Sequence, residues 1–342
     1  MPQSQFSAAV LYALDTPHER QKLAIKLFNE AMENEDNATA IDVANFVIGD
    51  ENCAYTFSAG FQMHCASWLA RHYRQCYADT TDNSPEEDEY LEKLIDILWK
   101  FKWLIARLPY DINISQDEIT QANELVTHFY EHFEYGQAAL AKALMHQNIK
   151  MGNVQAVQQH FETWQNTEAD WGNDCDACER NSLVEYHHFI GDYMRVIELA
   201  KPILSGEMSC GEVPHITYEF VIDSLIRTQQ TEAAQDLLNE AIDLITNNIE
   251  ENLHLLPSLI YLTHKVGDHD KAKDLLNDFN DAILTLAPNN RLYYLDYLIC
   301  VAPFNDEAIH EAQKVAAEFD ERNDNSFYQD KLTLMFGQIQ VH

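Results

Sequence analysis

The feature that most constrains the fold is a sequence pattern that recurs with a period of about 38 residues. Its three best copies are GDYMRVIELAKPIL (191–204), QQTEAAQDLLNEAI (229–242) and GDHDKAKDLLNDFN (267–280). Each copy begins with a polar or glycine turn and reaches a small or branched apolar residue five positions later. These residues are Val196, Ala234 and Ala272, with Val157 one step earlier and Ala308 one step later. The pattern predicts at least five similar structural units packed in series.

Composition and local signals indicate that these units are helical. The chain has only 10 glycines among 342 residues, and its apolar residues recur at helical spacing. Ser84 stands before Pro85 and two glutamates, which is typical of a helix N-cap, and Ser115 with Glu118 repeats the capping pattern. The sequence therefore predicts an all-α protein.

The repeated turn followed by a small residue resembles the tetratricopeptide repeat, in which two antiparallel helices pack closely around a small side chain. The resemblance implies an α-solenoid of helical hairpins that stack into a right-handed superhelix with a concave groove. We expect this solenoid over residues 137–342. Residues 1–136 are predicted to be a divergent helical region that packs on the solenoid, with long helices over 17–32, 57–77 and 88–108.

Three further segments resemble a group of bacterial tetratricopeptide-like proteins. They are the WKFKW helix (99–103) followed by a Leu-Pro turn, the Cys-x-x-Cys segment (175–178) and the CGEVPH segment (210–215). This likeness implies a shared architecture over roughly residues 98–280 and no general activity.

The cysteine segments predict a structural zinc site. Cys175 and Cys178 have the spacing of a metal-binding knuckle, and Cys210 with His215 follows at about the length of one helical hairpin. Because a hairpin returns the chain to the edge where it began, the two pairs can meet. Three thiolates and one imidazole form a closed tetrahedral set for Zn²⁺.

Other interpretations of these cysteines stay open. The thiols could be ordinary buried side chains, or Cys175 and Cys178 could be a redox pair, although the βαβ context of such pairs is missing. A catalytic zinc of the deaminase type lacks its His-x-Glu segment. A second group, His64, Cys65, His72 and Cys76, is expected to be a packed helix face, and His187 with His188 a helix-packing pair.

The net charge of −34 restricts the partners. So acidic a chain, without a basic patch, repels nucleic acid and anionic membranes, and it attracts basic proteins. No apolar run approaches the roughly 20 residues that span a bilayer. The N-terminal segment MPQSQFSAAVLYALDTPHER lacks the basic n-region of a signal peptide, so we expect a cytoplasmic protein.

The sequence contains no nucleophile elbow, P-loop, dinucleotide motif or HExxH motif, and we predict that the protein is not an enzyme. The first hypothesis is a scaffold that binds a basic protein or peptide, for example an immunity-type protein that neutralises a toxin domain. The alternative is a cytoplasmic regulator that senses a peptide or small ligand in its groove. A third hypothesis is an enzyme that uses the cysteine cluster.

Overall fold

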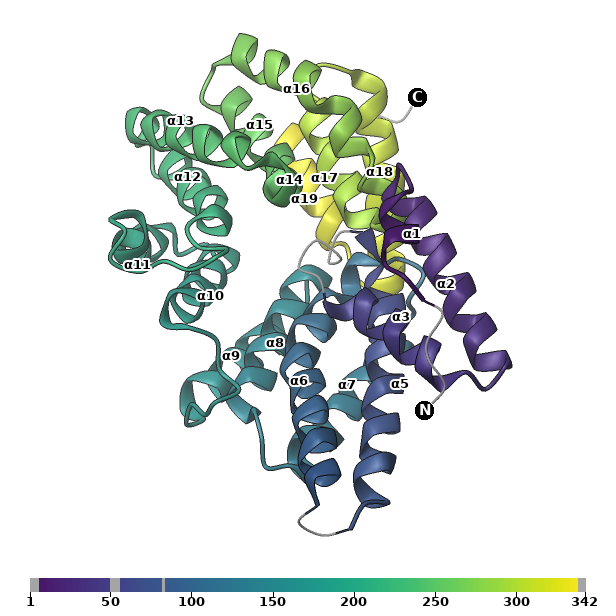
Figure 1. Ribbon diagram of the computed structural model, residues 1–342. Coiled ribbons are helices and arrows are strands. Elements are labelled where there is room, and N and C mark those ends of the chain that lie inside the picture. The colour runs from purple at the N-terminus through teal and green to yellow at the C-terminus, as the bar shows by residue number, and fades with distance from the viewer. Residues whose placement is uncertain (1–5, 50–55, 82–83, 338–342) are drawn as a thin grey trace.

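The structure, a computed structural model, describes residues 6–49, 56–81 and 84–337. All regular secondary structure within these ranges is helical, as the sequence predicts (Figure 1). The N-terminal helices are α1 (Ala9–Tyr12), α2 (Pro17–Glu33), α3 (Asn37–Gly49), α5 (Ala59–Ala78), α6 (Pro85–Arg107), the short 3₁₀ helix η1 (Leu108–Tyr110) and α7 (Gln116–His132).

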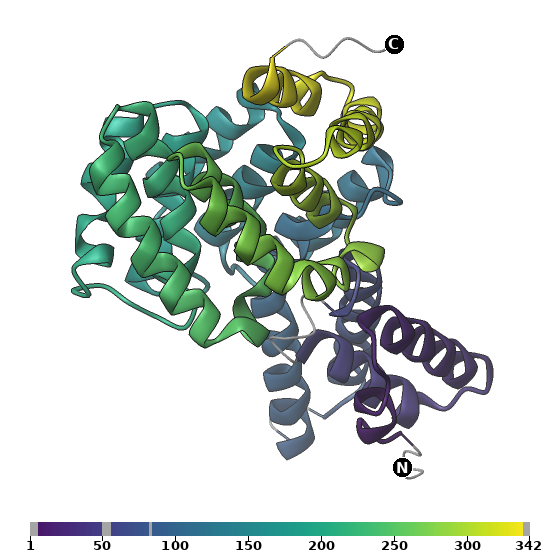
Figure 2. The same ribbon diagram turned by 90° about the horizontal axis from the view of Figure 1, so that it is seen from above.

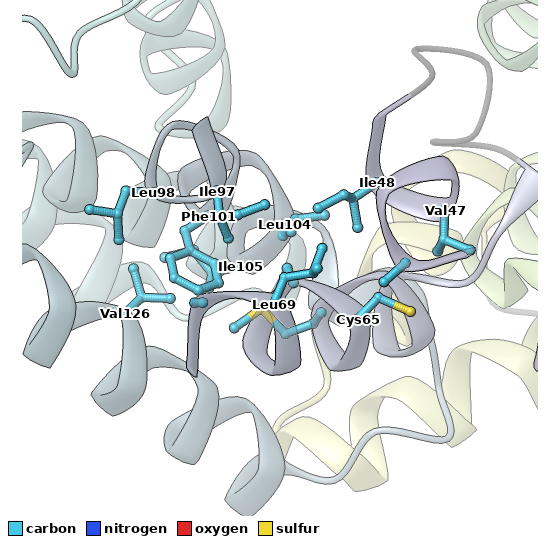
Figure 3. Packing of buried hydrophobic residues seen from close by; sticks show 14 of the residues in the cluster. Val47, Ile48, Cys65, Leu69, Ile97, Leu98, Phe101, Leu104, Ile105 and Val126 are labelled. Carbon is cyan, nitrogen blue, oxygen red and sulfur yellow. The ribbon is translucent and has the colours of Figure 1, made fainter. Parts of the chain in front are cut away.

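The predicted long N-terminal helices correspond to α2, α5 and α6. The start signals predicted at Ser84 and Ser115 are present, at the beginning of α6 and of α7. Ser84 accepts a hydrogen bond from the backbone N–H of Glu87, and Ser115 forms a full capping box with Glu118. Apolar residues of α3, α5, α6 and α7 meet in one core, in which Leu69 and Phe101 are fully buried (Figure 3). This core continues into α8 through Leu140 and Ala143.

The rest of the chain is a succession of helices joined mostly by short turns, with longer loops over 167–175 and 205–214. They are α8 (Gln137–Met151), α9 (Val154–Asn166), α10 (Asp176–Phe189), α11 (Tyr193–Leu204), η2 (His215–Thr217), α12 (Tyr218–Arg227), α13 (Thr231–Asn247), α14 (Ile249–Asn252), η3 (Leu253–Leu255), α15 (Leu256–Lys265), α16 (His269–Leu284), η4 (Ala287–Asn289), α17 (Arg291–Val301), α18 (Asp306–Asn323) and α19 (Phe327–Phe336). Five pairs pack as hairpins: α8 with α9, α10 with α11, α12 with α13, α15 with α16, and α17 with α18.

The small or branched residue of each repeat lies early in the second helix of a hairpin and is buried. None of the five is more than 6% exposed: Val157, Val196, Ala234, Ala272 and Ala308. Successive hairpins also contact one another, since α12 packs on α11, α15 on α13 and α17 on α15. One period of the sequence pattern thus corresponds to one helical hairpin.

Helices of the N-terminal region contact helices of the C-terminal region. Asn289, in η4, donates a hydrogen bond to the Thr56 carbonyl, and its side-chain oxygen lies 3.1 Å from His18 Nδ1. Arg322 of α18 donates to the carbonyl oxygens of Pro109 and Asp111, each at 3.0 Å. Figures 1 and 2 show the yellow C-terminal helices against the blue and teal segments that contain η1 and α8. The helices therefore curve round until η4 packs against α2 and α18 against the segment around η1.

No helix among the described residues is both long enough and apolar enough to cross a membrane.

Candidate metal centre

The three cysteines come from the start of α10 and from the loop after α11. Cys175 is the N-cap residue of α10, and Cys178 lies in its first turn. Cys210 lies in the loop after α11, where its backbone N–H donates to the Val213 carbonyl at 3.1 Å. Ala177, Ile203 and Val213 form a small buried core between the two segments, and Cys178 and Cys210 pack on it.

The sulfur atoms are close enough to share one metal ion. All three Sγ atoms lie within 4.8 Å of one another, and Cys178 Sγ is 3.2 Å from Cys210 Sγ. Zn–S bonds of about 2.3 Å keep two ligand sulfurs within about 4.6 Å, so the spacing suits such an ion. The structure thus brings together three of the four residues predicted from the sequence, and this cluster could hold a metal.

His215, the fourth predicted ligand, does not belong to this group. It begins η2, and its ring nitrogens do not lie within 4.8 Å of all three sulfurs. Its Nδ1 atom is buried and has no hydrogen-bond partner among the described residues. Coordination of a metal by His215 stays a prediction.

Two buried lysines hold the loop that leads into Cys175. Lys102 of α6 lies 2.7 Å from Asp174 Oδ1 and donates to the Gly172 carbonyl, also at 2.7 Å. Lys142 of α8 lies 2.6 Å from the other carboxylate oxygen of Asp174 and 2.5 Å from Glu179 Oε1. Both lysines are at most 3% exposed. Helices α6 and α8 therefore fix the position of the residue before Cys175.

Aromatic rings complete the environment of Lys102. Its Nζ atom lies 3.4 Å from the ring centroid of Trp99 and 4.9 Å from that of Trp103. Burial lowers the pKa of Lys102, and the Asp174 carboxylate opposes that shift. Burial likewise acts to raise the pKa of Asp174, but the two lysines lower it overall. The WKFKW helix thus anchors the cysteine loop.

The pKa values of two thiols differ because of their positions. Burial acts to raise the pKa of Cys175, but backbone N–H groups at the start of α10 and the neighbouring thiols lower it overall. Burial, and then the neighbouring thiols, raise the pKa of Cys178. The exposed Cys175 is therefore the more readily ionised of the two.

Sequence reasoning missed Lys102, Lys142 and Glu179. A signal existed for Lys102, since a lysine within an apolar helix between two tryptophans needs a buried partner. Nothing in the sequence indicates that this partner is Asp174, which lies far along the chain.

The second predicted group behaves as packing. Cys65 is fully buried in the core shown in Figure 3, and burial raises its pKa. The ring of His72 stacks on Trp68 with centroids 5.3 Å apart. His188 packs between helices as expected, with Nε2 2.8 Å from Asp223 Oδ2 of α12.

No family model, curated protein or solved structure matches this chain. The likeness to tetratricopeptide proteins thus rests on sequence segments of this chain alone.

Proposed function

We propose that the protein is a non-catalytic scaffold of tetratricopeptide-like hairpins that binds a basic protein or peptide. Five hairpins with a recurring buried small residue support the repeat architecture. An immunity-type protein that covers a basic toxin domain is the concrete form of this proposal.

The observation that carries the proposal is a pair of exposed acidic rows on α13 and α16. Each row has four carboxylates on one face of its helix, and the second row repeats the first after one period of the sequence pattern. The rows are Glu232, Asp236, Glu240 and Asp243, and Asp270, Asp274, Asp278 and Asp281. None of these carboxylates forms an ion pair with another described residue, although Glu240 accepts a hydrogen bond from Tyr218 and Asp281 accepts one from Asn280.

The two rows lie on neighbouring helices. Both helices pack on α15, and Lys271 of α16 donates a hydrogen bond to Asn239 of α13 at 2.7 Å. A surface of this kind attracts a partner with lysines or arginines spaced along one face, and it speeds the encounter.

Within this proposal the three thiols hold a structural zinc ion. The metal would join the loop before α10 to the loop after α11 and so fix two successive hairpins relative to each other. Zinc is the best candidate because it accepts sulfur ligands and undergoes no redox change.

Binding of a synthetic lysine-rich peptide, measured by calorimetry at several salt concentrations, tests the scaffold function. In the test variant, four carboxylates of the two rows become amides: Asp236→Asn, Asp243→Asn, Asp274→Asn and Asp278→Asn. In the control variant, four exposed glutamates elsewhere become glutamines: Glu92→Gln, Glu124→Gln, Glu131→Gln and Glu321→Gln.

Both variants change the net charge by the same amount. We expect the test variant to bind the peptide about tenfold more weakly and the control variant to bind nearly as wild type does. Equal weakening in both would show that total charge, and not this surface, attracts the peptide.

A further inference from the structure

An open pocket of about 440 Å³ lies directly beside the three thiols. The start of α10 and the loop after α11 form its walls. It is lined by Cys175, Asp176, Ala177, Glu207, Met208 and Ser209. Cys175 is thus shared by the thiol cluster and the pocket.

The donor set is one ligand short of a tetrahedral centre. Among the described residues, no further histidine, cysteine, aspartate or glutamate joins the three sulfurs within the distance that a shared metal requires. Cys178 and Cys210 are half-buried, whereas Cys175 is exposed. A metal held by these thiolates would therefore be accessible from the pocket side, and sites with three protein ligands take their fourth ligand from outside.

The walls of the pocket indicate the chemistry of that ligand. Met208 and Ala177 offer apolar contact, whereas Asp176 and Glu207 add two carboxylates beside the negative thiolate centre. These charges disfavour an anion and favour a positive group. A metal held by three thiolates also accepts soft sulfur donors.

We propose that the fourth coordination position binds a small thiol that carries a positive charge, an aminothiol. This inference rests on the metal centre proposed above. On binding, the thiol loses its proton to the solvent and its sulfur forms the fourth metal–sulfur bond, while the ammonium group lies near Asp176 and Glu207. No electron transfer is involved.

The test uses the full-length protein loaded with Co²⁺, whose sulfur-to-cobalt charge-transfer bands report thiolate ligands and whose visible bands report the fourth ligand. The thiols to be titrated are cysteamine, 2-mercaptoethanol and 3-mercaptopropionate, which are cationic, neutral and anionic. We expect saturable changes in the visible bands, with cysteamine binding about fivefold more tightly than 2-mercaptoethanol and 3-mercaptopropionate binding most weakly.

Two variants separate the contributions. The double variant Asp176→Asn/Glu207→Gln should keep the charge-transfer bands and lose most of the preference for cysteamine. His215→Ala should leave the spectrum of the thiol-free protein unchanged.

Three results would overturn the inference. Insensitivity to every thiol, together with an altered spectrum in His215→Ala, would show that His215 closes the centre. Equal affinities for the three thiols would remove the role of the carboxylates. Absence of charge-transfer bands would reject the metal centre itself, whereas the peptide-binding experiment would stand unaffected.

Discussion

At the scale of the residue, Gln229 has a backbone conformation that glycine adopts in the neighbouring hairpins. Gly191 and Gly267 end the first helices of their hairpins at φ 79° and 96°, and Gln229 occupies the equivalent turn at φ 61°. The left-handed conformation costs a residue with a side chain about 1 kcal/mol. Gln229→Gly should therefore raise the free energy of unfolding by about 0.5–1 kcal/mol, as measured by urea denaturation.

The neighbouring residue provides the control for this prediction. Gln230 has φ −96°, where a side chain causes no such strain. Gln230→Gly should leave the protein no more stable than wild type. If both glycine variants were equally stable, the strain at Gln229 would not be the cause.

Asp296 of α17 should make stability depend on pH. Burial raises the pKa of this carboxyl to about 6, the charge of Glu219 adds to the shift, and Lys331 and Lys150 oppose it. A pKa that is higher in the folded protein than in the unfolded chain favours folding at low pH, and this contribution is lost as the pH rises through about 6. Asp296→Asn should thus raise the unfolding free energy by about 2 kcal/mol at pH 8 and change it little at pH 4. An equal change in melting temperature at both pH values would contradict this assignment.

At the scale of the element, α6 is expected to stabilise the cysteine loop through one buried cation. Replacing Lys102 by methionine keeps the aliphatic chain and removes the charge that Asp174 and the Gly172 carbonyl bind. Lys142 still pairs with Asp174, so we expect Lys102→Met to lower the unfolding free energy by about 3 kcal/mol. It should also weaken Co²⁺ binding, because the loop before Cys175 loses an anchor.

Lys100→Met is the matched control on the same helix. Lys100 pairs with Asp96 one turn earlier, at the surface, and such pairs contribute less than about 1 kcal/mol. Urea denaturation and Co²⁺ titration of both variants check the prediction. Equal losses of stability and of Co²⁺ affinity in Lys102→Met and Lys100→Met would mean that the loss of any positive charge on α6 has this effect.

The helices could be predicted from the sequence because their signals are local. The contacts of the site could not be predicted, since they join segments that lie far apart along the chain. Ser115 with Glu118 indicates a helix start within a single turn, and the buried Ala234 follows from one period of the repeat. The same period also spaces polar contacts: the pair of His188 with Asp223 repeats the pair of Lys150 with Glu185 one period further along the chain.

The predicted cluster of three cysteines and one histidine is found only in part for the same reason, and zinc binding stays a prediction. Hairpin length predicts that Cys210 returns to Cys178, and the structure agrees. The direction of a single side chain in an irregular loop, as for His215, does not follow from spacing.

At the scale of the whole molecule, closure of the chain depends on the absence of a side chain at Gly152. A Cβ atom there would lie 2.3 Å from both Cβ and Cγ of Phe327 in α19. Nearby, Tyr328 donates a hydrogen bond to the Lys150 carbonyl, and Asn325 donates to that of Met151. Gly152→Ala should therefore displace α19 and lower the unfolding free energy by about 3 kcal/mol, from left-handed strain and overpacking together.

Gly191→Ala separates these two causes, because Gly191 has the same left-handed conformation with no atom closer than 3.8 Å to an added Cβ. Gly191→Ala should lower the unfolding free energy by about 1 kcal/mol, from left-handed backbone strain alone. In a Phe327→Gly background the clash is absent, because both Cβ and Cγ of residue 327 are removed. Gly152→Ala should then also cost about 1 kcal/mol, and the difference measures the coupling between α8 and α19. Small-angle scattering should show a larger radius of gyration for Gly152→Ala than for Gly191→Ala, since only the former opens the contact between α8 and α19. If the two alanine variants lost equal stability and kept the same radius, the packing of α19 on α8 would not hold the molecule closed.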